Sequence, residues 1–460
     1  MSLFKWCSNG MHMMLFGDVL AIYSSSEKGN CCCVSMHVVY GQKGALNMVI
    51  VAAFIAMRSK VIFILLMLLI TVSGTNSDGT LSKQRILEVE RKLKHLRKHS
   101  LKTIQSEDGD IIDCVNIKKQ PAFDHPALKD HKIQMAPSYN SAKKDPIERT
   151  RSKTKSAMMK QKDDESYATV TSQIWQKSGS CPKGTIPVRR IRKRELLKAH
   201  SINEYGRKKP SFLNRQKAIV FATGFRYLGG KGDIRVFSPS VEKDDEYSTA
   251  QVSLLNGSYN DYECIESGWA VNPSVYGDRK TRLFVYWTAD GSHETGCFDL
   301  TCPGFIQTSN EIALGAAIYP IPVPGGLPYQ ITIYIYKDLI TNNWWVQYGE
   351  NTNIGYWPPE IFRAICYNAE SVEWGGEVYS TTVGHTPHTK TQMGNGQFSR
   401  GDSASILRMR VHDNYPSLKI PEWVQYYSDE YNCYDVYYQS DYLEDPEFYY
   451  GGPGSNLMCP

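Results

Sequence analysis

Two glutamates stand out as residues that could do chemistry, because each lies among Gly and Trp residues. Glu266 lies in the string IESGW (265–269) and Glu377 ends the string VEWGGE (372–377). A Gly lets another backbone or a ligand approach closely, and a Trp wall can raise the pKa of a carboxyl group. Two carboxyls in one cleft would do general acid–base chemistry. The plainer interpretation is two strand-end glutamates beside packing aromatics, and composition alone favours it.

Other catalytic motifs are weak or missing. The string GDS at 401–403 occurs in serine-protease nucleophile loops, but no motif with a partner His precedes it, so we predict a turn. His385 and His388 could be metal ligands, but a Pro between them and the lack of a carboxylate pattern favour a loop. No GxSxG elbow, P-loop or dinucleotide fingerprint is found. The metal, nucleotide and serine-nucleophile interpretations are therefore all weak.

The elements that must carry these glutamates are short strands. β-rich runs recur between Gly, Pro and Asn breakers, with no long helical periodicity. The predicted strands are 218–223, 233–237, 250–255, 282–287, 311–319 and 330–336. Strand alternation would place Glu373 and Glu377 on one face and Trp374 on the other. This pattern predicts an all-β domain, an antiparallel sandwich or barrel, over 211–460.

The net charge of +5 hides an asymmetry along the 460 residues. Residues 1–210 hold 36 Lys and Arg against 18 Asp and Glu, whereas 211–460 hold 16 against 29. Such a split favours either a nucleic-acid-binding arm or two halves that attract each other. Because no basic patch with interleaved aromatics occurs in the first half, we do not expect nucleic acid as a partner. We expect a basic pro-segment that docks on an acidic domain and is released in acid.

The N-terminal part carries a secretion signal. A basic start at 57–60, a 12-residue apolar run at 61–72 and small residues after it are typical of a signal peptide over 57–74. The run is too short to span a bilayer. We interpret residues 1–56 as a mispredicted extension with translation starting at Met57. After signal cleavage we expect no stable membrane association.

Secretion changes how the cysteines are interpreted. Eight remain after position 56, and an even number in an oxidising compartment favours disulfides. Cys297 with Cys302 would close a short loop, and Cys433 with Cys459 would tie down the C-terminus. We expect Cys114 and Cys181 also to be disulfide-bonded. The sequon at Asn256 predicts glycosylation.

We expect residues 75–210 to form a small pro-domain with both helices and strands. Ile86, Val89, Leu93 and Leu96 have helical spacing, which predicts an amphipathic helix over 81–99. Residues 140–172 are polar and charge-dense, as in a disordered linker. Basic clusters at 189–194 and 207–209 are either a solvated face or processing sites.

Long strings resemble the neprosin family of secreted plant glutamic peptidases. Toward the N-terminus, the segments 101–104, 113–115, 119–126 and 181–187 look like that family's activation peptide. Toward the C-terminus the matching strings are IESGW (265–269), YWTAD (286–290), TGCFDLTCPGFIQTS (295–309), NWW (343–345), IGYWP (354–358), VEWGGEVY (372–379), TQMGNGQF (391–398) and YYGGPG (449–454). The resemblance covers about residues 100–460.

The resemblance implies a β-sandwich acid endopeptidase that typically cleaves after proline, with no metal or cofactor and with Glu266 and Glu377 as its catalytic pair. It also places Gln251 where an amide could donate to the oxyanion. We expect a zymogen whose own pro-domain is an intramolecular inhibitor, secreted to the apoplast or the vacuole. Proline-containing peptides would be its substrates. Six aromatic residues could form a subsite for the proline ring, although several are expected to fill the core: Trp269, Trp344, Trp345, Tyr356, Trp357 and Trp374.

Two other functions remain open. A glycosidase also uses paired carboxylates across an aromatic cleft. An inactive wall-binding or carbohydrate-binding sandwich would use the same aromatic residues without catalysis.

Overall fold

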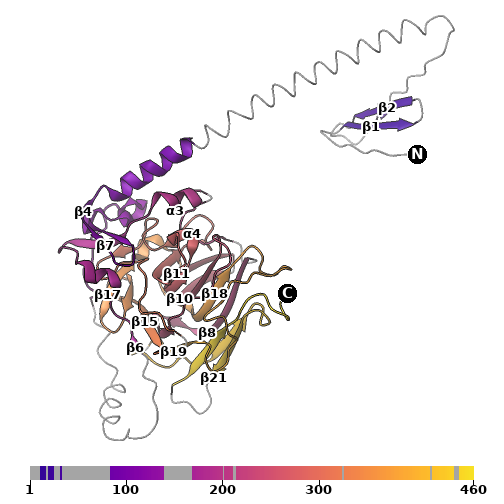
Figure 1. The fold of residues 1–460 in the computed structure, drawn as a ribbon. Coiled ribbons are helices and arrows are strands. Elements are labelled where there is room, and N and C mark those ends of the chain that lie inside the picture. The colour runs from indigo at the N-terminus through magenta and orange to yellow at the C-terminus, as the bar shows by residue number, and fades with distance from the viewer. Residues whose placement is uncertain are drawn as a thin grey trace, which may run out of the picture. The chain divides into compact units, whose positions relative to one another are not determined.

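The computed structural model describes residues 11–16, 19–24, 32–33, 83–138, 168–199, 201–210, 214–258, 260–323, 326–414, 417–439 and 445–460 (Figure 1). The chain divides into two units, Met1–Ser82 and Lys83–Pro460. In the first unit, β1 (Met11–Phe16), β2 (Val19–Ser24) and β3 (Cys32–Cys33) form an antiparallel sheet. The predicted signal peptide lies outside the described residues, as does most of the proposed extension. No helix in the described part of the chain is long and apolar enough to cross a membrane.

Two sheets of the second unit make a sandwich, as the strand pattern predicts. The first sheet runs, in spatial order, through β13 (Cys297–Phe298), β12 (Arg282–Thr288), β11 (Asp261–Val271), β10 (Tyr247–Ser258), β18 (Ala369–Tyr379), β8 (Arg215–Tyr227) and β20 (Val424–Ser428). The second runs through β14 (Ile306–Gln307), β17 (Thr352–Trp357), β16 (Trp344–Tyr348), β15 (Tyr329–Lys337), β9 (Gly229–Arg235), β19 (Ala404–His412), β22 (Glu447–Gly451) and β21 (Asp435–Gln439). β6 (Ala168–Thr169) pairs with β15 in parallel.

The core lies between these sheets. Val252 and Trp374 of the first sheet belong to one buried cluster with Ile333 and Ile406 of the second. Strand alternation produces this arrangement, because each strand turns every other side chain inward. The opposite face of the first sheet is therefore available for polar groups.

One predicted strand is wrong. Residues 311–319 form no strand, and only isolated bridges occur there, from Leu314 to Val188 and from Ala317 to Arg282. Gly315 has a φ of +73°, which interrupts an extended backbone. This apolar segment is buried as irregular chain.

The part of the second unit ahead of the sandwich is a small region of mixed helices and strands, as expected. It comprises the described residues between 83 and 210, and we call it the pro-region. β4 (Ser100–Gln105), β5 (Ile111–Asn116) and β7 (Thr185–Arg189) form an antiparallel sheet. A helix spans residues 83–97, where Val89 and Leu93 are buried as the periodicity predicts. Short helical segments complete the unit: η1 (Ile117–Lys119), η2 (Pro121–Asp124), η3 (Pro126–Leu128), η4 (Ile174–Ser178) and α3 (Lys193–Lys198). Most of the predicted linker at 140–172 lies outside the described residues.

Three disulfides join the six cysteines expected to be oxidised. Cys114 pairs with Cys181, Cys297 with Cys302, and Cys433 with Cys459. The first lies within the pro-region, and the other two lie within the sandwich. Among the described residues, Cys264 and Cys366 are free.

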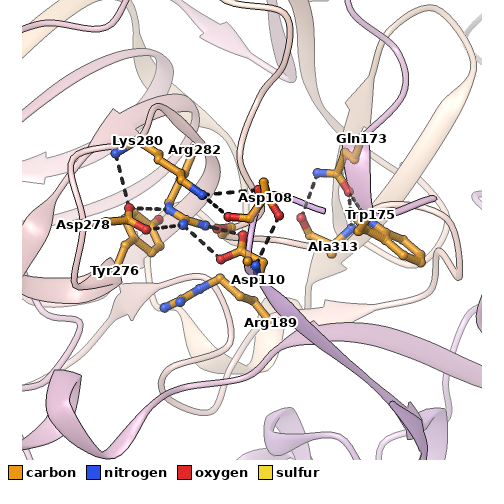
Figure 2. A network of polar contacts seen from close by, with 12 residues as sticks. Asp108, Asp110, Gln173, Trp175, Arg189, Tyr276, Asp278, Lys280, Arg282 and Ala313 are labelled. Atoms are coloured by element: carbon orange, nitrogen blue, oxygen red, sulfur yellow. Dashed lines mark hydrogen bonds and ion pairs between the residues drawn. The ribbon is translucent and has the colours of Figure 1, made fainter. Parts of the chain in front are cut away.

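Two glutamine side chains of the pro-region bind the backbone of the sandwich. Each amide accepts from the N–H and donates to the carbonyl of one residue, as a neighbouring strand would. Gln173 accepts from the Ala313 N–H through Oε1 at 2.7 Å and donates from Nε2 to the Ala313 carbonyl at 2.9 Å (Figure 2). Gln120 makes the same pair of bonds with the backbone of Gln307, at 2.8 and 3.1 Å. These amides satisfy backbone groups that would otherwise be buried without partners.

A buried arginine supplies the charged part of the same interface. Arg282 of β12 is 0% exposed, and its guanidinium donates to Asp110 of the pro-region at 2.7 and 3.1 Å (Figure 2). Asp278 accepts from the same group at 2.7 and 3.1 Å. Here the pro-region supplies the acidic partner and the sandwich supplies the basic one. We expected the reverse, a basic pro-segment on an acidic domain, so the net charges of the two parts do not explain this contact.

Replacing Asp110 should therefore weaken the docking. We expect Asp110→Asn to lower the free energy of unfolding of the full chain by about 3 kcal/mol, because Arg282 keeps its charge in a buried position with one carboxylate fewer. Urea unfolding followed by Trp fluorescence measures this. Asp244→Asn is the control, since Asp244 pairs with Lys198 on the surface and its loss should cost less than about 1 kcal/mol. Equal losses in the two variants would contradict the buried-pair account.

Candidate active site

Both predicted glutamates lie on one face of the first sheet, on either side of β10. Glu266 of β11 lies opposite Ser253, and Glu377 of β18 lies opposite Thr249. Ser253 and Thr249 are four residues apart on β10, so their side chains point to the same face. Glu266 is 5% exposed and Glu377 is 1% exposed. The sheet register thus brings together two carboxyls that are 111 positions apart in sequence.

Gln251 lies on the same face, between the two glutamates. Its neighbours across the strands are Gly268 on one side and Gly375 on the other. A Cβ at Gly268 would lie 1.9 Å from the Ala250 carbonyl oxygen, so the close approach of β10 and β11 requires glycine there. Gln251 is 3% exposed, and its Oε1 has no hydrogen-bond partner among the described residues. A buried amide oxygen without a partner among the described residues therefore lies on the face that carries the two carboxyls.

A lysine from the pro-region lies between the two glutamates. Lys208 Nζ is 2.7 Å from Glu266 Oε2 and 3.0 Å from Glu377 Oε1. The Lys208 side chain is 0% exposed. One small group can therefore contact both carboxyls at once.

The chain around Lys208 is fixed by backbone and ring contacts. The Gly206 carbonyl accepts from the Phe298 N–H at 2.7 Å, and the Tyr205 hydroxyl donates to the Val275 carbonyl at 2.6 Å. Gly206 has a φ of +83°, and a Cβ there would lie 2.0 Å from Thr301 Oγ1. Only glycine fits this position, so residues 205–208 follow one path into the site.

Glu377 is surrounded by groups that favour its charged form. The Tyr247 hydroxyl donates to Glu377 Oε1 at 2.6 Å, and Arg215 Nη1 lies 3.9 Å from Oε2. Burial alone would raise the pKa of this carboxyl, but Lys208, Arg215 and Lys217, with the Tyr247 hydrogen bond, lower the pKa to about 2. The same two glutamates raise the pKa of Lys208 against the opposing effect of its burial. Glu377 is therefore ionised in this state.

Glu266 has weaker partners. Besides Lys208, its carboxyl accepts from the Cys264 thiol, with Sγ 3.3 Å from Oε1. Burial raises the pKa of this thiol well above its ordinary value, so it stays a neutral and weak donor. The surroundings of the two glutamates are unequal, and Glu377 has the stronger hydrogen-bond donor.

The structure does not bring the six predicted aromatic residues to this site, and the prediction that they line it is wrong. All six are 0% exposed. Trp269 and Trp374 each lie three residues from a glutamate on the same strand, which places them on the opposite face, in the core. The other four lie on the second sheet: Trp344, Trp345, Tyr356 and Trp357. These side chains pack the sandwich.

The sequence reasoning missed the groups that do surround the carboxyls. Tyr247, Tyr286, Arg215 and Lys208 all lie there, and Lys208 appeared only as one member of a basic cluster. No local signal distinguishes Lys208 from Arg207 or Lys209. Only the path of the chain buries one of the three.

Two further predictions concern residues away from this face. Asn256 lies near the end of β10, where Nδ2 donates to the Asn368 carbonyl at 2.7 Å, and its glycosylation stays a prediction. His388 lies near Glu430, Cys433 and Cys459, a grouping that could hold a metal by distance. The two sulfurs are bonded to each other, so they are not thiolate ligands.

Comparison with known proteins places the chain in a family. The neprosin family model matches residues 244–453, and the neprosin activation peptide model matches 103–227, which extends through β8. Scytalido-glutamic peptidase with a peptide-based transition-state analogue aligns at a TM-score of 0.29 and 12% identity, over 53% of this chain and 98% of that one. SCP-B, a member of the eqolisin family of peptidases, aligns at a TM-score of 0.27 and 10% identity, over 53% of this chain and 98% of that one. The two matched domains show that the chain belongs to the neprosin family, the glutamic peptidases that its motifs resemble, and carries the activation peptide ahead of the neprosin domain.

Proposed function

We propose that this chain is the precursor of an acid endopeptidase of the glutamic type that cleaves preferentially after proline. Glu266 and Glu377 would be its catalytic pair. The observation that carries the proposal is Lys208 Nζ, which contacts both carboxyls at 2.7 and 3.0 Å. A water molecule has about the size of that ammonium group, so a water in its place would lie within reach of both glutamates. The preference for proline rests on the family resemblance.

The reaction follows from two carboxyls that share one proton. Two buried carboxyls facing one space disfavour simultaneous ionisation, so the pair holds a single proton in acid. The ionised carboxyl accepts a proton from the water, whose oxygen attacks the peptide carbonyl. The protonated carboxyl then donates its proton to the leaving nitrogen, which separates as a neutral amine. The Gln251 amide would donate to the oxyanion of the tetrahedral intermediate.

The unequal surroundings assign the two roles. Tyr247 donates to Glu377 at 2.6 Å and Arg215 lies near it, and both favour the ionised form. Among the described residues of the sandwich, the hydrogen-bond donor to Glu266 is the Cys264 thiol, at 3.3 Å. We therefore assign Glu377 as the general base and Glu266 as the proton donor.

Lys208 would keep the precursor inactive. Its ammonium would occupy the place of the attacking water, and a positive charge in contact with both carboxyls opposes the protonation that catalysis needs. Acid supplies protons that compete with this contact. The pro-segment would then leave by cleavage, which we expect near the basic clusters at 189–209.

The remaining properties agree with a secreted enzyme. Disulfides persist in oxidising compartments, and three occur in the described residues. Secretion to the apoplast or vacuole, and proline-containing peptides as substrates, complete the proposal.

A direct assay tests the activity against its rivals. The acid-treated protein should cut a proline-rich peptide on the carboxyl side of proline, with a bell-shaped rate profile centred in acid. Mass spectrometry identifies the fragments. Sugar release from a polysaccharide panel would instead support the glycosidase, and retention on polysaccharide without any cleavage would support a binding module.

Glutamine replacements test the catalytic pair. Glu266→Gln and Glu377→Gln should each lower the rate by about 100- to 10,000-fold, because an amide cannot exchange the proton. Circular dichroism should show an unchanged fold. Glu373→Gln is a matched control, since Glu373 lies on the same strand and face but pairs with Lys217 at 2.8 Å, and its rate should fall far less. A pair variant with a near-normal rate would refute the assignment.

Replacing Lys208 should change how stability depends on pH. The pKa of Glu377 is lowered from its ordinary 4.5 to about 2, so its stabilisation is present above pH 4.5 and is lost as the pH falls toward 2. The raised pKa of Lys208 keeps it charged throughout this range. Lys208→Met should therefore lower the free energy of unfolding by about 3 kcal/mol at pH 7 and by much less at pH 3.

Urea unfolding of the intact full chain at the two pH values measures this difference. Lys209→Met is the control, since Lys209 pairs with Glu204 on the surface and 45% of its side chain is exposed. An effect of Lys208→Met that stays constant between pH 7 and pH 3 would contradict the ion contact.

A further inference from the structure

Three aromatic rings surround the Lys208 ammonium in addition to the two carboxyls. Nζ lies 4.8 Å from the ring centre of Tyr286, 5.9 Å from that of Tyr247 and 5.9 Å from that of Phe298. Aromatic faces attract cations within about 6 Å, most strongly where water is excluded. The Lys208 side chain is 0% exposed, so water is excluded here.

All five of these groups belong to the sandwich and not to the pro-region. Glu266 and Glu377 lie on β11 and β18, and the rings lie on β10, β12 and β13. Tyr286 is paired directly with Glu266 across the strands, and Phe298 is paired with Tyr286. The rings also pack on one another, with 5.1 Å between the centres of Tyr286 and Phe298 and 6.0 Å between those of Tyr247 and Phe298. We call these two carboxyls and three rings the cage; all five groups come from strands of the first sheet.

We propose that this cage is a binding site for primary alkylammonium ions in general, and that free alkylamines occupy it reversibly when Lys208 is absent. The ligand must be a primary ammonium, because its N–H groups donate to both carboxyls while its charge faces the rings. It must also be unbranched near the nitrogen, as a lysine side chain is. The inhibition that follows from this binding rests on the proposed peptidase function, whereas the binding itself does not.

Removal of the Lys208 side chain tests the binding. In the full chain at neutral pH, Lys208→Ala leaves the pro-segment held by Tyr205 and Gly206 and removes the three outer methylenes and the ammonium, a propylammonium group. Added n-propylammonium chloride should then raise the thermal midpoint by about 3 °C or more, because a ligand that binds only the folded state stabilises it. Sodium chloride at equal ionic strength and n-propanol should not reproduce the rise.

Two chains provide the matched comparison. The wild-type chain should show no rise, since Lys208 fills the site, and Lys209→Ala should show none, since Lys209 is a surface residue. A rise confined to Lys208→Ala supports the proposal. No rise in that variant, or an equal rise in all three chains, overturns it.

A second measurement uses the enzyme freed of its pro-segment and does not depend on how Lys208→Ala folds. n-Butylammonium should raise KM for a proline-containing peptide several-fold without changing kcat, and n-butanol should not. An unchanged KM in an active enzyme overturns the proposal. Should the protein cleave no peptide while the thermal rise persists, the proposed peptidase function fails and the ammonium site stands.

The inhibition should weaken as the pH falls, because protonation of either glutamate removes a charge that the ammonium contacts. The other groups that face this position keep their charge state in the acid range: Tyr247, Cys264 and Tyr286 stay neutral, and Arg215 and Lys217 stay positive, with the pKa of each of the five raised. The ratio of KM values with and without n-butylammonium should therefore be larger at pH 6 than at pH 4. A ratio that does not change with pH overturns the carboxylate contact.

Discussion

Two buried carboxyls that face one space need a positive charge between them, and much of this molecule follows from how that charge is supplied. Glu266 and Glu377 are almost fully buried, and an unpaired carboxylate in such a place is costly. In the precursor the charge is the ammonium of Lys208, which contacts both groups. In the proposed enzyme it is a shared proton. The proposed latency and the proposed activity in acid would then have one cause, because a lysine and a proton compete for the same pair of carboxyls.

The rest of the fold holds this arrangement in place. β10 separates the two glutamate strands, and Gly268 and Gly375 leave its Gln251 without side chains beside it. Gly206 lets the pro-segment pass against Thr301, so that Lys208 reaches the pair. Farther away, Arg282 with Asp110 and Gln173 with Ala313 join the pro-region to the sandwich. The difference in net charge between the two halves of the chain does not explain these contacts. The pro-region supplies the basic partner in one buried ion pair and the acidic partner in the other.

Local sequence patterns predicted the features that depend on neighbouring residues along the chain. Alternating strands gave the all-β class, helical spacing gave the burial of Val89 and Leu93, and the expected cysteines are paired. Strand parity also explains the main error, because Trp269 and Trp374 lie an odd number of residues from the glutamates and so face the core. Lys208 was missed because its burial depends on a chain path fixed by Gly206 and Phe298, which no local pattern records. The signal peptide lies outside the described residues and stays a prediction.

The carboxyl protonation state tests the central claim most directly. Carbon-13 NMR of labelled glutamate side chains can follow Glu266 and Glu377, assigned through their glutamine variants, in the full chain and after the pro-segment has been removed. At pH 5 Glu377 should be ionised in the full chain, since its pKa there is about 2. After removal, the pair should hold one proton at the same pH. Identical titration curves before and after removal would contradict the account that Lys208 stands in for the catalytic proton.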